Sequence, residues 1–333
     1  MSFNLKLFAK PTVQELASRI HEKRDYVRIA AEQENLYKSP SGYLPWNIHL
    51  RACFLSGSTE VALAGYQSGD LLAVKVGELA RDAVTAKAPA RYISKEMCEA
   101  FMQTSVPVLP KEILEVLPYV YIILPSETVY DHLNDEVVSL IVHTGKLYPE
   151  NIPQQDIGKE IVKEFFPGEL ETPPEFFGAS GIQVATITSE GSNFWQEFID
   201  SEAKSWQDEH IKQRKNSGYE NIATEQIMRI AINSLLIHLY EPELITVDPA
   251  PRIPNATGFG KCPGRQPLGP TWIGKSFRYQ REKEIDPVDQ KQSRGSVRAH
   301  WRRGHWHTIL HGTKKQERRV QWFKPVFVGR SAT

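Results

Sequence analysis

The chain has 333 residues, of which 41% are hydrophobic and 24% are charged; these values exclude a disordered chain, a collagen and a continuous coiled coil, and predict a folded protein of about two domains. Its 40 basic and 40 acidic side chains cancel, but residues 251–333 hold 18 Lys/Arg against five Asp/Glu, a net charge of +13 that leaves −13 for residues 1–250. This asymmetry predicts a polyanionic partner for the basic end or, alternatively, docking of that end on the acidic body.

The first part of the chain, residues 1–110, is predicted to be mainly helical. Its first helix places Val13 and Leu16 on an apolar face at a 3.6-residue period, and Pro40-Ser41-Gly42 follows its end. Further helical stretches follow, and the one over 59–88 is rich in alanine and leucine. The predicted helices span 11–37, 46–56, 59–88 and 94–103.

Residues 111–247 are predicted to form an α+β body with a small antiparallel sheet. Two β-branched and aromatic runs, 119–124 and 136–142, have the length of strands, and a long connection between them suits antiparallel neighbours. A third run, 182–188, alternates apolar and polar residues as a half-buried strand does.

Two helices are predicted after these strands, over 192–213 and 219–240. The second repeats Ile230 and Leu235 at helical spacing and is apolar on most sides, so we expect it at the centre of the body. His238 lies within this apolar stretch, and we expect it to be a hydrogen-bonded core residue rather than a ligand. Fold class is therefore predicted as α+β.

Residues 248–270 contain six prolines and four glycines and are predicted to be a linker or an extended surface strap. The string Gly258-Phe259-Gly260 lacks the Lys-Ser/Thr pair of a phosphate-binding loop, so we do not interpret it as one.

The three cysteines are widely spaced and form no CxxC motif, so they predict neither a disulfide framework nor a thiolate zinc site. The N-terminal stretch lacks the apolar run of a signal peptide, and no run of 18 apolar residues occurs. We therefore expect a cytoplasmic protein that does not span a membrane.

Residues 271–333 form a basic, His/Trp-rich C-terminal region. Four of the ten histidines fall between positions 300 and 311, and three tryptophans accompany them. Strand alternation over 305–311 places His305 and His307 on one face and Trp306 on the other. A turn and a second strand over 319–328 complete a predicted β-hairpin with an aromatic inner face and a His/Arg outer face.

Arginines neutralise phosphates and tryptophans stack on unpaired bases, so this hairpin predicts binding of RNA or single-stranded DNA. The predicted RNA or phosphate contacts are Arg302, Arg303, His305, His307, Arg318 and Arg319. The residues predicted either to stack on bases or to form the hairpin core are Trp301, Trp306 and Trp322. A purely structural hairpin remains an open alternative.

Catalysis is a further alternative. His300, His305 and His307 are candidates for general acid and base in metal-independent cleavage of RNA, with Arg302, Arg303 or Arg319 stabilising the developing charge. The same histidines are poor candidates for zinc because no cysteine or acid lies close in sequence and the flanking charge is positive. We expect neither a metal nor a cofactor.

The C-terminal region also carries a family resemblance. The string His-x-Arg-Arg-Gly-His-Trp-His at 300–307, then Gly312, Arg-Val-x-Trp at 319–322 and Phe-Val at 327–328, resembles the C-terminus of the large type V-A anti-CRISPR family. An apolar helix ending in Glu-Pro precedes it at a comparable distance, whereas residues 1–110 show no such similarity.

The resemblance implies a protein encoded on phage, plasmid or other mobile DNA that protects its element from CRISPR immunity. Members of the family suppress production of the type V-A effector by recognising its N-terminal peptide as it leaves the ribosome and causing degradation of the message. The implied partners are that peptide and the mRNA or translating ribosome. We expect the peptide at an exposed sheet edge or interhelical groove of the body; whether the chain cleaves RNA or recruits a nuclease stays open.

Overall fold

The computed structural model describes residues 8–106, 109–147, 178–215, 222–250, 267–278, 300–311 and 317–328. The helices are α1 (Val13–Ile20), α2 (Arg24–Gln33), α3 (Trp46–Ser56), α4 (Thr59–Ser68), α5 (Leu71–Thr85), α6 (Lys95–Met102), α8 (Ser201–Lys215) and α9 (Ile222–Tyr240), with 3-10 turns η2 (Lys111–Glu115) and η4 (Pro242–Leu244). The strands are β1 (Ala90–Ile93), β2 (Thr104–Ser105), β3 (Tyr119–Ile123), β4 (Val137–Lys146), β5 (Ser180–Thr188), β6 (Ser192–Phe198), β7 (Ile245–Val247), β8 (Thr271–Ile273), β9 (His300–Arg302), β10 (Gly304–His311), β11 (Glu317–Phe323) and β12 (Val326–Val328).

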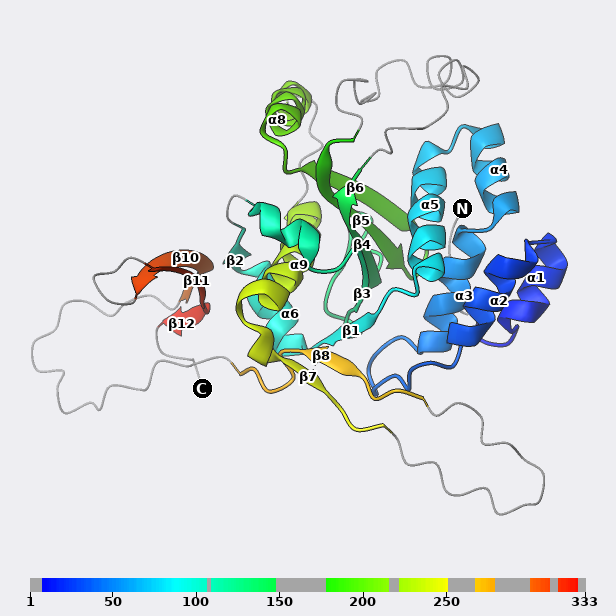
Figure 1. Cartoon of the computed structure of the whole chain (residues 1–333), viewed down its shortest axis with the longest axis horizontal. Coiled ribbons are helices and arrows are strands. Elements are labelled where there is room, and N and C mark those ends of the chain that lie inside the picture. Colours follow the sequence, from blue (N-terminus) through cyan, green and yellow to red (C-terminus); the bar gives the residue numbers. More distant parts are fainter. Residues whose placement is uncertain are drawn as a thin grey trace, which may run out of the picture.

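A seven-stranded sheet occupies the middle of the molecule, in the order β6-β5-β4-β3-β1-β8-β7 (Figure 1). The predicted antiparallel pairing of the runs at 119–124 and 136–142 is confirmed, with Tyr121 opposite Ile141. The sheet is not the small antiparallel sheet that the sequence predicts, because β1, β6, β7 and β8 add to the three predicted strands. The short β1 pairs in parallel with both β3 and β8, so the sheet is mixed. The fold is α+β, as the sequence predicts.

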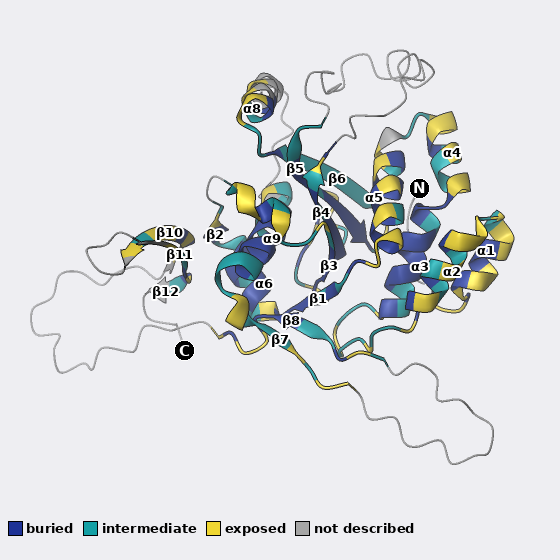
Figure 2. Cartoon of the chain, viewed as in Figure 1, coloured by how far each residue is buried: buried dark blue, intermediate teal, exposed yellow. Residues whose placement is uncertain are grey.

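Helices cover both faces of this sheet, and each face has its own apolar cluster. On one face, Trp46 and Phe54 of α3 pack with Tyr121 of β3. On the other, Ile230 and Leu235 of α9 pack with the opposite sides of β3, β4 and β5. Because both faces are covered, β5 is buried throughout most of its length rather than half-buried as its alternation predicted (Figure 2).

The apolar helix α9 is central, as predicted. Its residues Ile227, Ile230 and Leu235 have no exposed surface. His238 is hydrogen-bonded as predicted but only partly buried: its Nδ1 atom donates to the carbonyl of Ser234 at 2.8 Å, and Arg91 Nε donates to its Nε2 atom at 3.3 Å.

Two of the long predicted helices are each divided into two. The stretch 11–37 breaks at His21, whose φ of 49° is left-handed, and so gives α1 and α2. The stretch 59–88 breaks at Gly69, whose φ of 73° suits a residue without a Cβ. Asp70 then caps α5 by accepting a hydrogen bond from Ala73 N at 2.9 Å. At both positions the helix therefore ends, although the apolar pattern of the sequence continues past it.

The prediction of a helix over 192–213 is wrong for its first nine residues. Residues 192–198 form β6, which pairs antiparallel with β5, and the helix begins only at Ser201. Consecutive residues of β6 belong to opposite sides of the sheet: Phe194 packs against the α3–α5 cluster and Trp195 against the α9 cluster. Residues 192–198 therefore form an edge strand instead of the predicted helix, because their side chains pack on both sides of the sheet.

Most of the predicted linker, 251–266, lies outside the described residues, as does its Gly258-Phe259-Gly260 string. Within the ranges that the structure describes, no helix combines the length and apolarity needed to cross a membrane.

Candidate nucleic-acid interface

The C-terminal hairpin forms as predicted from strand alternation. Strands β10 and β11 pair antiparallel, with Trp306 opposite Trp322 and His305 opposite Phe323. The second strand ends earlier than the predicted residue 328, because Pro325 has no N–H to donate to a ladder. The chain then forms β12, which pairs with β9 instead.

The hairpin joins the body through a short parallel contact with β2. Gly304 lies opposite Thr104, and the N–H of Gly304 donates to the carbonyl of Gln103 at 3.1 Å. A Cβ atom on Gly304 would overlap the Thr104 hydroxyl and lie 2.8 Å from Cδ of Pro325. Glycine is therefore needed here for close approach of the two strands.

Two tryptophans fix the hairpin to the body. Trp306 Nε1 donates to Asn233 Oδ1 of α9 at 2.7 Å, and Trp322 Nε1 donates to Thr104 Oγ1 at 3.3 Å. Their rings stack with centroids 6.2 Å apart and are 8% and 4% exposed. These two indoles thus lie in the core between hairpin and body, where bases cannot reach them. The side chain of Trp301 lies outside the described residues.

Asn233 of α9 is a polar contact of the body with the hairpin, in addition to Thr104. It is fully buried, and its Nδ2 atom donates to the carbonyls of Phe101 and Thr104 at 3.4 and 3.5 Å while Oδ1 accepts from Trp306. Sequence reasoning missed this residue. The available signal was an asparagine inside an otherwise apolar helix, since a buried amide needs hydrogen-bond partners.

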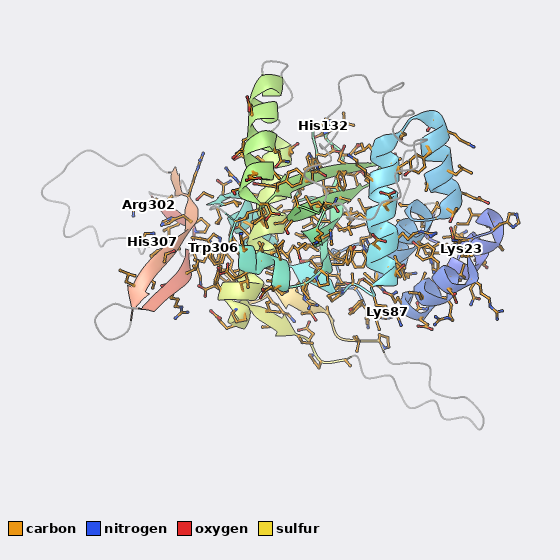
Figure 3. All side chains as sticks on the ribbon, turned by 45° about the horizontal axis from the view of Figure 1, so that its top comes forward. Lys23, Lys87, His132, Arg302, Trp306 and His307 are labelled. Carbon is orange, nitrogen blue, oxygen red and sulfur yellow. The ribbon has the colours of Figure 1, made fainter. Side chains whose placement is uncertain are left out.

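The opposite face of the hairpin is exposed. Of the predicted RNA contacts, Arg302, Arg303, His305, His307 and Arg319 have exposed side chains. The ring centroids of His305 and His307 are 6.4 Å apart. Figure 3 shows His307 on the hairpin and Arg302 on the adjoining strand β9 at one end of the molecule, with Trp306 next to the body. The side chains of His300 and Arg318 lie outside the described residues.

Sequence reasoning also missed Phe323, which is 41% exposed on this outer face. Its ring lies 5.1 Å from that of His305, with the two planes within 4° of parallel, and 5.9 Å from that of His307. The signal was available, because Phe323 shares the strand parity of Arg319 and Gln321 and opposite parity to Trp322.

Two acids of the body lie against β11. Glu241 Oε1 accepts a hydrogen bond from the backbone N–H of Trp322 at 3.2 Å, and burial raises the pKa of the Glu241 carboxyl. The hydrogen bond from Glu241 lowers the pKa of Glu243, and the charges of Arg319 and Lys324 lower it further. Part of the hairpin's positive charge therefore interacts with the acidic body.

A buried constellation in the body resembles a nucleophile with its base but cannot act as one. His49 Nδ1 hydrogen-bonds Ser139 Oγ at 3.0 Å, and its Nε2 lies 3.6 Å from Cys53 Sγ. All three side chains are fully buried. Burial lowers the pKa of His49 to about 3 and raises the pKa of the Cys53 thiol, so the cluster is uncharged and closed to substrate.

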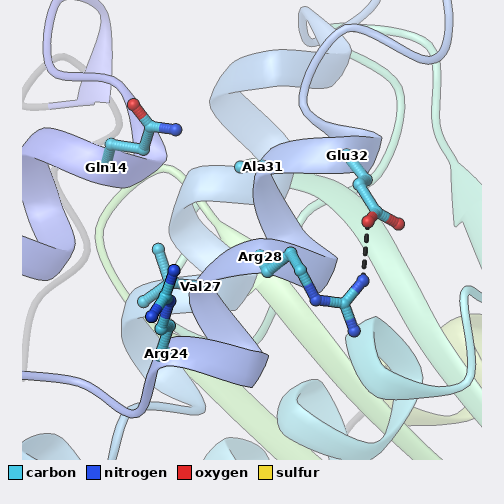
Figure 4. A pocket seen from close by; sticks show the side chains of 6 residues that line it. All are labelled: Gln14, Arg24, Val27, Arg28, Ala31 and Glu32. Atoms are coloured by element: carbon cyan, nitrogen blue, oxygen red, sulfur yellow. Dashed lines mark hydrogen bonds and ion pairs between the residues drawn. The ribbon is translucent and has the colours of Figure 1, made fainter.

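Figure 4 shows a surface hollow between α1 and α2 that also lacks a chemical site. Arg28 and Glu32 form an exposed ion pair there, 2.7 Å apart and one helical turn from each other, and Glu32 also pairs with Lys87 at 3.1 Å. The lining residues are Gln14, Arg24, Val27, Arg28, Ala31 and Glu32. Across the described parts of the chain, no three His, Cys, Asp or Glu side chains are grouped to hold a metal ion.

Comparison with known families identifies the chain. The AcrVA2-like profile, which describes the anti-CRISPR type V subtype A2 family, matches residues 92–330. The chain belongs to this family. The match covers more than two thirds of this anti-CRISPR chain, from β1 through the hairpin, and confirms the resemblance seen at 300–328. It leaves α1 to α5 outside. No curated protein and no solved structure gives a significant match. Membership of an anti-CRISPR family implies a CRISPR effector as the target.

Proposed function

We propose that this anti-CRISPR protein acts in the cytoplasm and suppresses production of a type V-A effector nuclease. It recognises the N-terminal peptide of the effector during translation and promotes degradation of the effector mRNA. The observation that carries the proposal is the family match over residues 92–330. A mobile genetic element that encodes such a protein escapes the nuclease before the nuclease accumulates.

In this proposal the outer face of the hairpin is the surface that contacts RNA. Arg303 and Arg319 are exposed and contact phosphates, and His305 and His307 supply further donors. Two further phosphate contacts are proposed outside this face: Arg302 belongs to β9, and Arg318 pairs with Leu310 on the opposite face of the hairpin. The tight docking of Trp306 on Asn233 supports this role, because it fixes the exposed face relative to the body.

The peptide is proposed to bind the body at the edge of the seven-stranded sheet. Within the described residues, β6 pairs with β5 only, so an extended peptide can add main-chain hydrogen bonds on its other side. The side chain of Gln207 already bonds the carbonyl of Gln196 and the N–H of Phe198. The binding stretch is therefore the first half of the strand, and a Ser192→Pro substitution should weaken recognition without removing a ladder bond to β5.

A pair of reporter messages tests peptide recognition. Both carry the first codons of a type V-A effector before a reporter gene, but in the second a compensated frameshift changes the encoded peptide and leaves the RNA almost unchanged. We expect co-expression to lower the amount of the first mRNA and to spare the second. Equal loss of both messages, or loss of neither, would contradict recognition of the nascent peptide.

A second candidate function is direct cleavage of RNA by the hairpin. It is favoured by one observation: the His305 and His307 rings lie 6.4 Å apart on an exposed face with basic residues nearby, which suits a general acid and base. Recruitment of a host nuclease needs no such pair. An assay with purified protein separates the two and is described below.

A further inference from the structure

The outer face of the three-stranded sheet β11-β10-β2 carries a cluster of exposed rings. His305 and His307 of β10 and Phe323 of β11 all project from this face and are exposed. Phe323 is 41% exposed beside the two histidine rings, although full burial of a phenylalanine side chain is favourable by about 2 kcal/mol. We name these three residues the ring cluster.

The geometry of the ring cluster suits a flat ligand. His305 and Phe323 are direct cross-strand partners with nearly parallel planes, 5.1 Å between centroids. His307 stands almost perpendicular to both, at 77°. The cluster therefore presents two parallel rings and one ring at right angles, held on the rigid ladder of an antiparallel hairpin.

The charge around the cluster selects an anionic ligand. Arg303 adjoins β10, and Arg319 lies on the same face of β11 as Phe323; both are exposed. Among the side chains that the structure describes at 302–310 and 319–326, Arg302, Arg303, Arg319 and Lys324 are basic and none is acidic. A flat aromatic group attached to a phosphate satisfies both the rings and the arginines, and single-stranded RNA has both in every nucleotide.

The edge of the hairpin suits a peptide less well than its face suits RNA. A peptide that adds to β11 would need the N–H groups on the strand's outer side, and the N–H of Trp322 already donates to Glu241. The face carrying the ring cluster has no such restriction.

We propose that the ring cluster is a base-stacking site for unpaired nucleotides of RNA, with Phe323 as its principal ring. This inference rests on the proposed contact of the hairpin with RNA and adds the residue that stacks. It gives the stacking role to Phe323 in place of Trp306 and Trp322, which the body covers. Sheets that present exposed aromatic rings beside basic residues bind single-stranded RNA in this manner, with little dependence on base identity.

The test measures binding of the full-length protein to a labelled single-stranded 12-nucleotide RNA by fluorescence anisotropy, at several salt concentrations. The variants are Phe323→Ala, Phe323→Tyr, Arg303→Ala and Leu310→Ala. Leu310 is the matched control, because it is an exposed apolar residue on the opposite face of the same hairpin. Circular dichroism in the near ultraviolet verifies that the Trp306–Trp322 pair remains packed in every variant.

We expect Phe323→Ala to weaken binding on the order of 5- to 100-fold, the loss of one stacked base, and to keep the salt dependence of the wild type. Phe323→Tyr retains a ring and should bind within about twofold of the wild type, as should Leu310→Ala. Arg303→Ala should weaken binding. It should also reduce the slope of the logarithm of the binding constant against the logarithm of the salt concentration by about one, the value for one phosphate contact.

Two results would overturn the inference, and they differ from each other. If Phe323→Ala binds as the wild type does while Arg303→Ala binds weakly, the hairpin contacts phosphates but the ring cluster does not stack, and the proposed function stands. If the wild-type protein binds no RNA at any salt concentration, the proposed RNA contact fails together with the stacking site.

Discussion

The indole N–H of Trp306 donates a hydrogen bond to the side-chain oxygen of Asn233, at 2.7 Å, between residues 73 positions apart in the chain. Both side chains are buried. The bond joins the C-terminal hairpin to the central helix α9, so the orientation of the exposed His/Arg face depends on a contact made on the opposite face of the same strand.

Replacing Asn233 with leucine should therefore loosen the hairpin. The indole N–H of Trp306 and two backbone carbonyls would lose their partner, and an unsatisfied buried group costs about 1–3 kcal/mol. The free energy of unfolding in urea, followed by tryptophan fluorescence, measures this. Thr308→Ala, at an exposed position of the same strand, should change the value by less than about 0.5 kcal/mol. Equal stability of the two variants would show that the hydrogen bond does not hold the hairpin.

Gly304→Ala should separate β10 from β2. The added methyl group overlaps the Thr104 hydroxyl and crowds Pro325, and overpacking of this kind costs about 1–3 kcal/mol. A double-mutant cycle with Thr104→Ala checks the cause by urea unfolding. Part of the cost of Gly304→Ala should disappear in the Thr104→Ala background, because one of the two overlaps is gone. If the losses in the free energy of unfolding of the two single variants simply add in the double variant, the strain does not come from the contact between residue 304 and the Thr104 hydroxyl.

The stability of the body should fall with acidity because of His49. Burial holds the pKa of His49 at about 3 in the folded protein, against an ordinary value of 6.5, so the unfolded chain binds a proton that the folded protein does not. The stabilisation is complete above pH 6.5 and is lost as pH falls towards 3, at up to about 1.4 kcal/mol per pH unit. His238, with a pKa lowered to about 4 by burial, adds to the same trend.

Urea unfolding at pH 7 and pH 5 measures this dependence in two variants. His49→Gln should be less stable than the wild type at pH 7 but lose less stability on acidification. Ser139→Ala removes the hydrogen bond to His49 and leaves the buried imidazole, so it should keep the full pH dependence. The prediction fails if His49→Gln and the wild type lose the same free energy between the two pH values.

The helices and the hairpin could be predicted from the sequence because their signals are local. The period of α9 and the alternation of β10 are each visible in one segment, and both elements form as predicted. The breaks at His21 and Gly69 and the strand β6 could not be predicted in this way. Each depends on contacts or caps that override a continuous apolar period.

The candidate site was predictable in its residue types and in its two faces, because alternation separates Trp306 from His305 and predicts an aromatic inner face. The sequence left open whether Trp306 and Trp322 stack on bases or form the core. The body decides this through Asn233 and Thr104, which receive the two indole N–H groups. The strand parity that Phe323 shares with Arg319 predicts its exposed face, but its place directly opposite His305 requires the register of the hairpin.

If the hairpin cleaves RNA directly, the purified protein should cleave RNA even when a chelator removes metal ions. Purified protein is incubated with labelled RNA, alone and as ribosome-bound message, in the presence of EDTA. Because general acid–base cleavage by His305 and His307 needs no metal, the cleaving enzyme should lose about 100-fold or more in rate when either is replaced by alanine. Intact RNA in both wild-type reactions would remove the ribonuclease hypothesis and leave binding with recruitment of a host nuclease.

The central claim is that the exposed face of the hairpin acts on the effector message. The most direct measurement is the half-life of a type V-A effector mRNA in cells after transcription is stopped, with wild-type protein, the His305→Ala/His307→Ala variant or the Leu310→Ala control at equal protein levels. We predict that the wild type and Leu310→Ala both shorten the half-life of the mRNA. With the double histidine variant, the mRNA should decay as slowly as it does in cells that lack the protein. Decay that stays equally fast with the folded double variant would contradict the claim.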